Sequence, residues 1–352
     1  MPPTLKLVIF VAACSQAPNT DATDDTQDTP PTTDSPTTPT DIDTGAAETG
    51  TTPTDTGEDH TAETGRTEDT GSTTTTAPPV ECESLSGEPT SITQLGAPRA
   101  SYGIAMNDVG QVLGSDQNSL LAVTYDEVVT VLAPGFRFSL QIASIDQGDL
   151  AIALDDLDSI VRFDPETGGQ SNIVTDTQAY GLTWGPDGKI WTADGTRVNR
   201  VDTLTGATEL VWEHAGLAPR VLGFSVDYTR LYIGTTYHGG DLFAIDLDSD
   251  HNPVGTAYIW ATGLGNWMDC IAVDSCDNIF VCDSTGSRLY RVSPDGTTVD
   301  IFVQWTESTY GHGVVFGSGF GGWRKDALYL PQPYNGNTVV EVVIGVGAAN
   351  AT

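Results

Sequence analysis

The sequence predicts an all-β fold, a six-bladed β-propeller, preceded by a disordered tether rich in Thr, Asp and Pro. From Ser91 onward, a unit of about 40 to 47 residues recurs along the chain, a period typical of propeller blades. Each copy contains short apolar strands separated by tight polar turns, and helical periodicity is nearly absent. Because one small sheet cannot bury both of its faces alone, we expect six such sheets to pack around a central axis and close into a ring.

The clearest copy of the unit lies between residues 181 and 202. An apolar strand, Gly181–Trp184, is followed by the turn Gly185–Gly188 and by a second apolar strand, Lys189–Thr192. A third strand, Arg197–Asp202, completes the pattern. The turn reads Gly-Pro-Asp-Gly, in which Pro presets φ and the last Gly supplies a positive φ, so it predicts a hairpin.

Five more copies align with this pattern and fill the rest of the globular part. Their inner strands are expected to begin at Gly103, Ile142, Gly223, Ile271 and Gly313. A strand from near Thr90 to Leu95 is expected to form the outer edge of the last blade, which would close the ring and protect an otherwise open edge. The propeller domain is therefore predicted to span residues 81–352.

The N-terminus has the layout of a bacterial lipoprotein signal peptide over residues 1–13. Lys6 precedes a run of apolar residues, and this run is far shorter than the roughly 20 residues that cross a bilayer as a helix. Its last residues, Val11–Ala13, resemble a lipobox and lead into Cys14, which this resemblance makes the lipidated first residue of the mature protein. Ser15 favours the outer membrane under the lipoprotein sorting pattern. Ordinary cleavage after Ala13 is the alternative, and the true start codon could lie upstream.

Residues 14–80 read as a disordered acidic linker behind the lipidated cysteine. The segment consists almost entirely of Thr, Asp, Glu, Pro, Gly, Ser and Ala, with Arg66 as its one strong base. Such a composition cannot bury enough apolar surface to offset the entropy of ordering the chain. We interpret it as a tether whose root-mean-square span is of order 45 Å.

The charge of the chain restricts its partners. Its 48 Asp and Glu against 14 Lys and Arg give a formal net charge of -34, shared by the linker and the globular part. Like charges repel, so nucleic acid is excluded as a strong partner, and no basic patch is present to recruit it. We expect a monomer that contacts the membrane through its lipid anchor and binds a small molecule or an envelope protein.

Two passages carry a resemblance to a known family. Trp267–Asp274 with Asp277–Val281 resembles a blade of the gluconolactonase and regucalcin family, and Val315–Gly317 with Leu328–Leu330 resembles its closing blade. Streptogramin-lyase-like and NHL-repeat propellers share these motifs. The family implies a divalent cation, usually calcium, at the channel mouth, with lactonase chemistry and ligands of one Glu, two Asn and one Asp.

Carried over by position, one of these four ligands is present here, as Asp269. The position of the first Asn falls near Ala179 or Tyr180, and that of the second falls near Leu222, so neither Asn is present. No Glu stands just before Gly103, where the family has its first ligand. Asp269 is therefore a candidate channel residue and metal ligand, and its alternative role is to cap the loop that enters the inner strand.

Two histidines are further candidates for chemistry. His312 precedes an inner strand, as Asp269 does, and with His238 it could act as a general acid or base or as a metal ligand. We expect the channel mouth to lie near Tyr102, Tyr180, Asp269 and His312. The leading hypothesis is a ligand-binding or partner-binding module on the cell envelope. The alternative is a metal-dependent lactonase, hydrolase or lyase, so the sequence leaves open whether the chain is an enzyme.

Cysteines complete the set of candidate residues. An exported protein folds in an oxidising compartment, and four cysteines remain once Cys14 is lipidated. Cys276 lies in a predicted turn, where it could meet Cys82, while Cys270 and Cys282 lie on adjacent predicted strands. Three pairings of the four are possible, and the sequence does not choose among them.

Overall fold

A computed structural model of the chain describes residues 82, 87–96, 103–107, 109–116, 118–136, 139–154, 157–236, 239–306, 313–333, 336 and 338–349. The predicted signal peptide, Cys14 and the whole of the predicted linker lie outside these residues. Where it is described, the chain is all-β, with short 3-10 turns such as Asp146–Gly148. None of the helices in these ranges is long and apolar enough to cross a bilayer.

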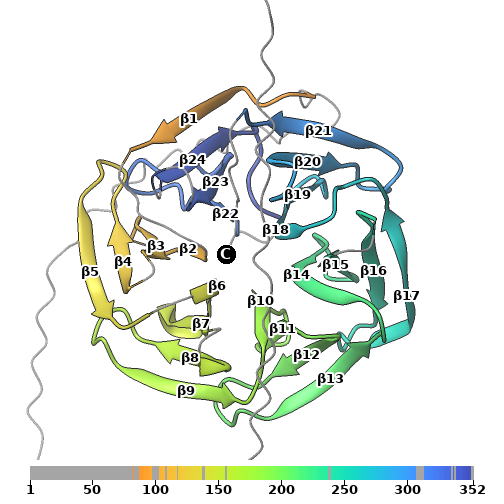
Figure 1. The fold of residues 1–352 in the computed structure, drawn as a ribbon, viewed down its shortest axis with the longest axis horizontal. Helices are drawn as coiled ribbons and strands as arrows, with labels where there is room; N and C mark the ends of the chain where they lie inside the picture. Colours follow the sequence, from red (N-terminus) through yellow and green to blue (C-terminus); the bar gives the residue numbers. More distant parts are fainter. Residues whose placement is uncertain are drawn as a thin grey trace, which may run out of the picture. The chain divides into compact units, whose positions relative to one another are not determined.

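The strands form six four-stranded antiparallel sheets arranged around a central axis, as the repeats predicted (Figure 1). In the first three blades the strands are, from the axis outward, β2 (Ile104–Met106), β3 (Val112–Ser115), β4 (Ser119–Val123) and β5 (Val129–Pro134); β6 (Ser139–Ser144), β7 (Leu150–Leu154), β8 (Ser159–Phe163) and β9 (Gln170–Thr175); and β10 (Ala179–Trp184), β11 (Ile190–Asp194), β12 (Arg197–Val201) and β13 (Thr208–Glu213).

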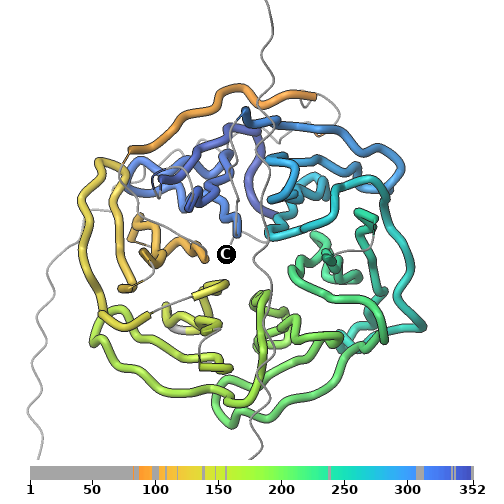
Figure 2. Tube along the Cα trace, viewed as in Figure 1, coloured from red at the N-terminus to blue at the C-terminus, as the bar shows by residue number. Residues whose placement is uncertain are grey.

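The last three blades follow the same order until the ring closes. Their strands are β14 (Ala218–Phe224), β15 (Arg230–Thr236), β16 (Leu242–Leu247) and β17 (Pro253–Ala261); β18 (Met268–Val273), β19 (Ile279–Asp283), β20 (Arg288–Val292) and β21 (Val299–Gln304); and β22 (Val315–Phe316), β23 (Ala327–Gln332), β24 (Thr338–Val343) and β1 (Ser91–Leu95). The chain trace passes from blade to blade around the axis (Figure 2).

Burial changes from the middle of each blade to its rim. Every residue of β7 is buried, because neighbouring blades cover both faces of the sheet, whereas most residues of the outer strand β9 are exposed. The predicted turn between β10 and β11 is present. Gly188 has φ +70°, and Asp187 accepts hydrogen bonds from the Lys189 amide and from Nε1 of the buried Trp191. Local turn chemistry therefore sets the hairpin on which the rest of the blade builds.

The ring closes where β1 pairs with β24, which confirms the predicted role of residues 90–95 (Figure 1). A buried polar cluster supports this junction between the last and first blades. The carboxylate of Glu341 accepts hydrogen bonds from the hydroxyl of Tyr329 at 2.6 Å and from that of Tyr125, in the first blade, at 3.2 Å. Burial, followed by the bond to Glu341, raises the pKa of Tyr329, so its hydroxyl stays protonated and can donate.

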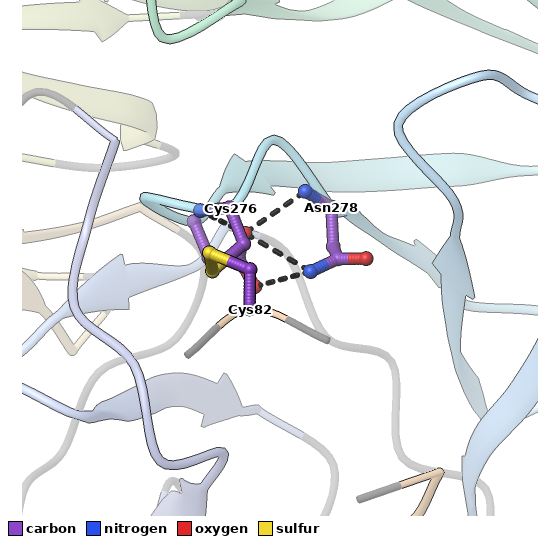
Figure 3. Close-up of a disulfide and its surroundings, with 4 residues drawn as sticks. Cys82, Cys276 and Asn278 are labelled. Atoms are coloured by element: carbon purple, nitrogen blue, oxygen red, sulfur yellow. Dashed lines mark hydrogen bonds between the residues drawn. A yellow bond between two sulfur atoms is a disulfide. The ribbon is translucent and has the colours of Figure 1, made fainter. Parts of the chain in front are cut away.

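Of the three possible cysteine pairings, the structure has Cys82–Cys276 and Cys270–Cys282. Cys270 and Cys282 are direct register partners on β18 and β19. Cys276 lies in the turn that joins these strands, and Asn278 lies beside its disulfide (Figure 3). Asp274 orders this turn by accepting hydrogen bonds from the backbone amides of Cys276 and Asn278. The first disulfide thus attaches the segment before β1 to the fifth blade.

Candidate functional site

The inner strands of the blades surround a cavity of about 360 Å³ along the propeller axis. Each blade contributes an apolar side chain to its wall, namely Ile104, Ile142, Leu182, Leu222, Ile271 and Val314. A few polar residues, Gln141, Ser144 and Thr183, interrupt the wall. The side chains that line the channel are therefore mostly apolar, while most of the surface exposed in it is polar.

Three polar side chains occupy equivalent positions at the start of neighbouring inner strands. Tyr180, Arg220 and Asp269 each stand two residues before the cavity-lining residues Leu182, Leu222 and Ile271 on β10, β14 and β18. The pairing of each inner strand with its neighbour shifts register at this point. Such irregularities re-aim side chains and are frequent next to functional sites.

Asp269 is the centre of this group and is fully buried. One carboxylate oxygen, Oδ1, accepts a hydrogen bond from the Tyr180 hydroxyl at 3.1 Å and another from Nε of Arg220. The other oxygen, Oδ2, accepts a hydrogen bond from the hydroxyl of Ser284, which follows β19. Both oxygens are thus engaged by side chains from three blades, and the charge of Asp269 is balanced by the guanidinium of Arg220.

The main chain of Asp269 extends these contacts to two more segments. Its carbonyl oxygen accepts a hydrogen bond from the amide of Gly313, just before β22, at 2.9 Å. It also accepts one from the side-chain amide of Gln141 on β6, at 3.3 Å. Asp269 therefore connects the inner ends of the second, third, fourth and fifth blades with the start of the sixth.

Aromatic rings flank the guanidinium of Arg220. Its central carbon lies 3.4 Å from the ring centroid of Tyr180 and 4.8 Å from that of Trp267. Such cation–π contacts hold a guanidinium in place where it is partly removed from water. Burial, followed by the nearby charge of Asp269, raises the pKa of Tyr180 well above its ordinary value. The hydroxyl of Tyr180 is therefore a stable donor at neutral pH.

The residues around Asp269 do not fit the calcium centre that the family resemblance implies. Such a centre needs several oxygen ligands directed at one point, whereas here a guanidinium already contacts the carboxylate. Tyr180 and Arg220 stand at or near the places where the resemblance expects Asn. Among the residues that the structure describes, no group of three or more His, Cys, Asp or Glu could hold a metal ion.

The predicted site residues divide into two sets. Tyr180 and Asp269 are in hydrogen-bond contact, while Tyr102, His238 and His312 lie outside the described residues. Sequence reasoning missed Arg220 and Ser284. The signal for Arg220 was a lone base in an apolar segment, two residues before the position that was aligned with the family's second Asn; no comparable signal marked Ser284.

No family model matches this sequence, and no curated protein matches it. Solved structures do. A gluconolactonase from Xanthomonas campestris is 17% identical over 72% of this chain and 89% of its own, with a TM-score of 0.61. The calcium-binding protein regucalcin from Agrobacterium tumefaciens is 18% identical over 75% and 95%, with a TM-score of 0.59. A streptogramin B lyase is 15% identical over 72% and 98%, with a TM-score of 0.50.

At these identities the likeness concerns the fold alone. The six-bladed arrangement of the described strands agrees with it. The chain thus has the propeller fold of the gluconolactonases, regucalcin and streptogramin B lyase, as its repeats and its motifs in the fifth and sixth blades predicted.

Proposed function

We propose that this chain is a ligand-binding propeller of the bacterial cell envelope, which takes a small molecule at the mouth of its central channel. One observation carries the proposal. At the position where a propeller of this kind could hold a metal, Asp269 is neutralised by Arg220 and lies beside a cavity of about 360 Å³ that is lined mostly by apolar side chains. This volume is within the range of small-molecule sites, which have mostly apolar walls and few polar groups.

The rival function, a metal-dependent lactonase, hydrolase or lyase, asks for different side chains. A metal would have to polarise a carbonyl and activate water, and a general base would have to lie within hydrogen-bond reach of the proton that it takes, whereas Asp269 is fully buried. Both oxygens of Asp269 already accept hydrogen bonds, from Tyr180, Arg220 and Ser284. The engaged carboxylate supports binding over catalysis at this point of the channel.

Thermal-shift titration of the purified protein with calcium, zinc and manganese separates the two functions. Because any ligand that binds the folded state raises the melting temperature, a binding propeller without a metal centre should show no shift with any of the three ions. A saturable rise with one of them would overturn the proposal in favour of the metal-dependent enzyme.

A second measurement tests the cavity itself. We expect 1-hexanol, a small apolar probe, to bind saturably in isothermal titration calorimetry. Leu222→Trp places a larger side chain in the cavity wall and should weaken this binding about tenfold or more, the equivalent of 1 to 3 kcal/mol of overpacking. Leu204→Trp is the control, because Leu204 is 83% exposed and lies outside the cavity lining. Equal binding to all three proteins would argue against a channel ligand.

Display on the envelope is the other part of the proposal and rests on the N-terminal sequence. Val11–Ala13 followed by Cys14 supports lipidation, and two or three acyl chains hold a protein on a membrane where one does not. We propose an outer-membrane lipoprotein. Labelling of cells with a fatty-acid analogue should mark the wild-type protein but not Cys14→Ser, which should appear in the soluble fraction. Equal labelling of both would rule out this anchor.

A further inference from the structure

The side chain of Arg220 presents donors that its known contacts do not use. Its Nε donates to Asp269, and the guanidinium also lies within side-chain hydrogen-bond reach of Tyr180; beyond these two contacts it makes no hydrogen bond or ion pair with the residues that the structure describes. The side chain keeps 17% of its surface exposed, so these donors are not sealed in the core. A guanidinium fixed along one edge and open along the other can recognise a planar acceptor with two oxygens.

We infer that the ligand of this propeller carries a carboxylate, which pairs with the terminal nitrogens of Arg220, and an apolar part that enters the channel. This inference rests on the proposed function and specifies its ligand class. Leu222 lines the cavity two residues beyond Arg220 on β14, which corresponds to about 7 Å along a strand. The charged and apolar contacts are therefore spaced for one small amphipathic molecule.

Asp269 acts in this site as a positioning residue. It has no exposed surface, and Tyr180, Ser284 and Arg220 already donate to its two oxygens, so it does not offer itself to a ligand. By accepting the Nε proton it fixes the plane of the guanidinium, while the rings of Tyr180 and Trp267 lie close to the same group. The pairing also fixes which edge of Arg220 remains for the carboxylate.

The negative charge of the whole protein does not attract an anion from a distance, so recognition of a carboxylate depends on its direct contact with Arg220. A formal net charge of -34 repels anions at a distance, but screening confines that repulsion to about 8 Å at physiological salt. A carboxylate that reaches Arg220 gains a charge-assisted, bidentate contact in a partly dehydrated place. Selectivity for an anion therefore depends on this one residue, since no basic patch surrounds it in the sequence.

Calorimetry with two probes of equal chain length tests the inference. Hexanoate should bind the wild-type protein about tenfold or more tightly than 1-hexanol, the advantage expected for hydrogen bonds to a charged group. Arg220→Gln should abolish this preference, and Arg220→Lys should keep only part of it, because an ammonium is a point charge without the planar fork. Asp269→Asn should reduce the preference while hexanol still binds, which a merely structural role would not produce.

The control is Arg162→Gln, which removes an arginine from another partly buried Arg–Asp pair, with Asp149 in the second blade. It should leave the preference unchanged. Because Arg220→Gln alone leaves Asp269 buried without its counter-charge, the double variant Arg220→Gln/Asp269→Asn provides a second protein that lacks both charges, and circular dichroism checks its fold. It should bind both probes equally.

The outcomes separate the inference from the proposed function. If both probes bind the wild type equally, or if the preference for hexanoate survives in the folded Arg220 variants, the inference is wrong and the apolar channel site stands. If neither probe binds, the channel site and the carboxylate inference both fail.

Discussion

The two disulfides should stabilise the protein by unequal amounts, because they close loops of very different length in the unfolded chain. Cys82 and Cys276 are separated by 194 residues, and Cys270 and Cys282 by 12. In the chain-entropy model the longer loop contributes about 5 kcal/mol and the shorter one about 3 kcal/mol to the free energy of unfolding. The expected difference is therefore about 2 to 3 kcal/mol, with the larger contribution from Cys82–Cys276.

The assay must separate loop closure from packing, since Cys270 and Cys282 are buried and their replacement would also disturb the core. We propose two alanine double variants, Cys82→Ala/Cys276→Ala and Cys270→Ala/Cys282→Ala. Each keeps one disulfide, and each is compared with itself after reduction. The side chains are then the same in both members of a comparison. Guanidinium denaturation followed by tryptophan fluorescence gives the loss on reduction for each bridge.

Reduction of the long-loop bridge should cost more than reduction of the short-loop bridge. An equal or smaller cost would refute the reasoning and would mean that the unfolded chain is already compact across blades one to five, so that the bridge restrains little. Peptide mapping without reduction is the control for pairing. Free thiols at all four positions in the native protein would contradict the disulfides themselves.

Two further predictions concern the inner strands. Gly181→Ala should lower the free energy of unfolding by about 1 to 3 kcal/mol in chemical denaturation. The reason is that a Cβ atom at position 181 would lie 3.0 Å from the carbonyl carbon of Arg220. Gly87→Ala is the control, because a Cβ atom at position 87 would have no atom within 4 Å. Stability should also fall as the pH rises above about 10, because the unfolded chain then loses tyrosine protons that tyrosines with raised pKa values, Tyr180, Tyr232 and Tyr329 among them, keep when folded. Tyr180 alone should contribute up to about 1.4 kcal/mol per pH unit to this slope. Tyr180→Phe should reduce this slope in denaturation curves at about pH 9 and about pH 11, and an unchanged slope would contradict the assigned shift.

The fold could be predicted because its signals are local and repeated. The hairpin at Gly185–Gly188 depends on residues adjacent in sequence, and each blade restates the pattern, so an error in one copy leaves the period intact. Ring closure followed from the same physics, since an open propeller leaves a strand edge exposed and residues 90–95 were the predicted strand that covers it. The observed pairing of β1 with β24 agrees with that argument.

The site was predicted only in part because its contacts cross blades. Asp269 meets Tyr180 and Arg220 at sequence separations of 89 and 49 residues, and no local pattern encodes such contacts. The family resemblance pointed to Asp269 as a ligand, but the residue that decides its chemistry is Arg220. The cysteine pairing was open for the same reason, since it depends on where the segment before β1 passes the fifth blade.

Several side chains at repeated positions separate this channel from the metal site that the family resemblance implies. The propeller places side chains at equivalent points of successive inner strands, and their identities set the local charge; with Arg220 beside Asp269, the pair is neutral and complete without an ion. The same pairing leaves the outer edge of the guanidinium for a ligand. A site of this kind should therefore prefer a small anion to a cation, even in a strongly acidic chain, because the terminal nitrogens of the guanidinium are hydrogen-bond donors and the distant negative charges are screened.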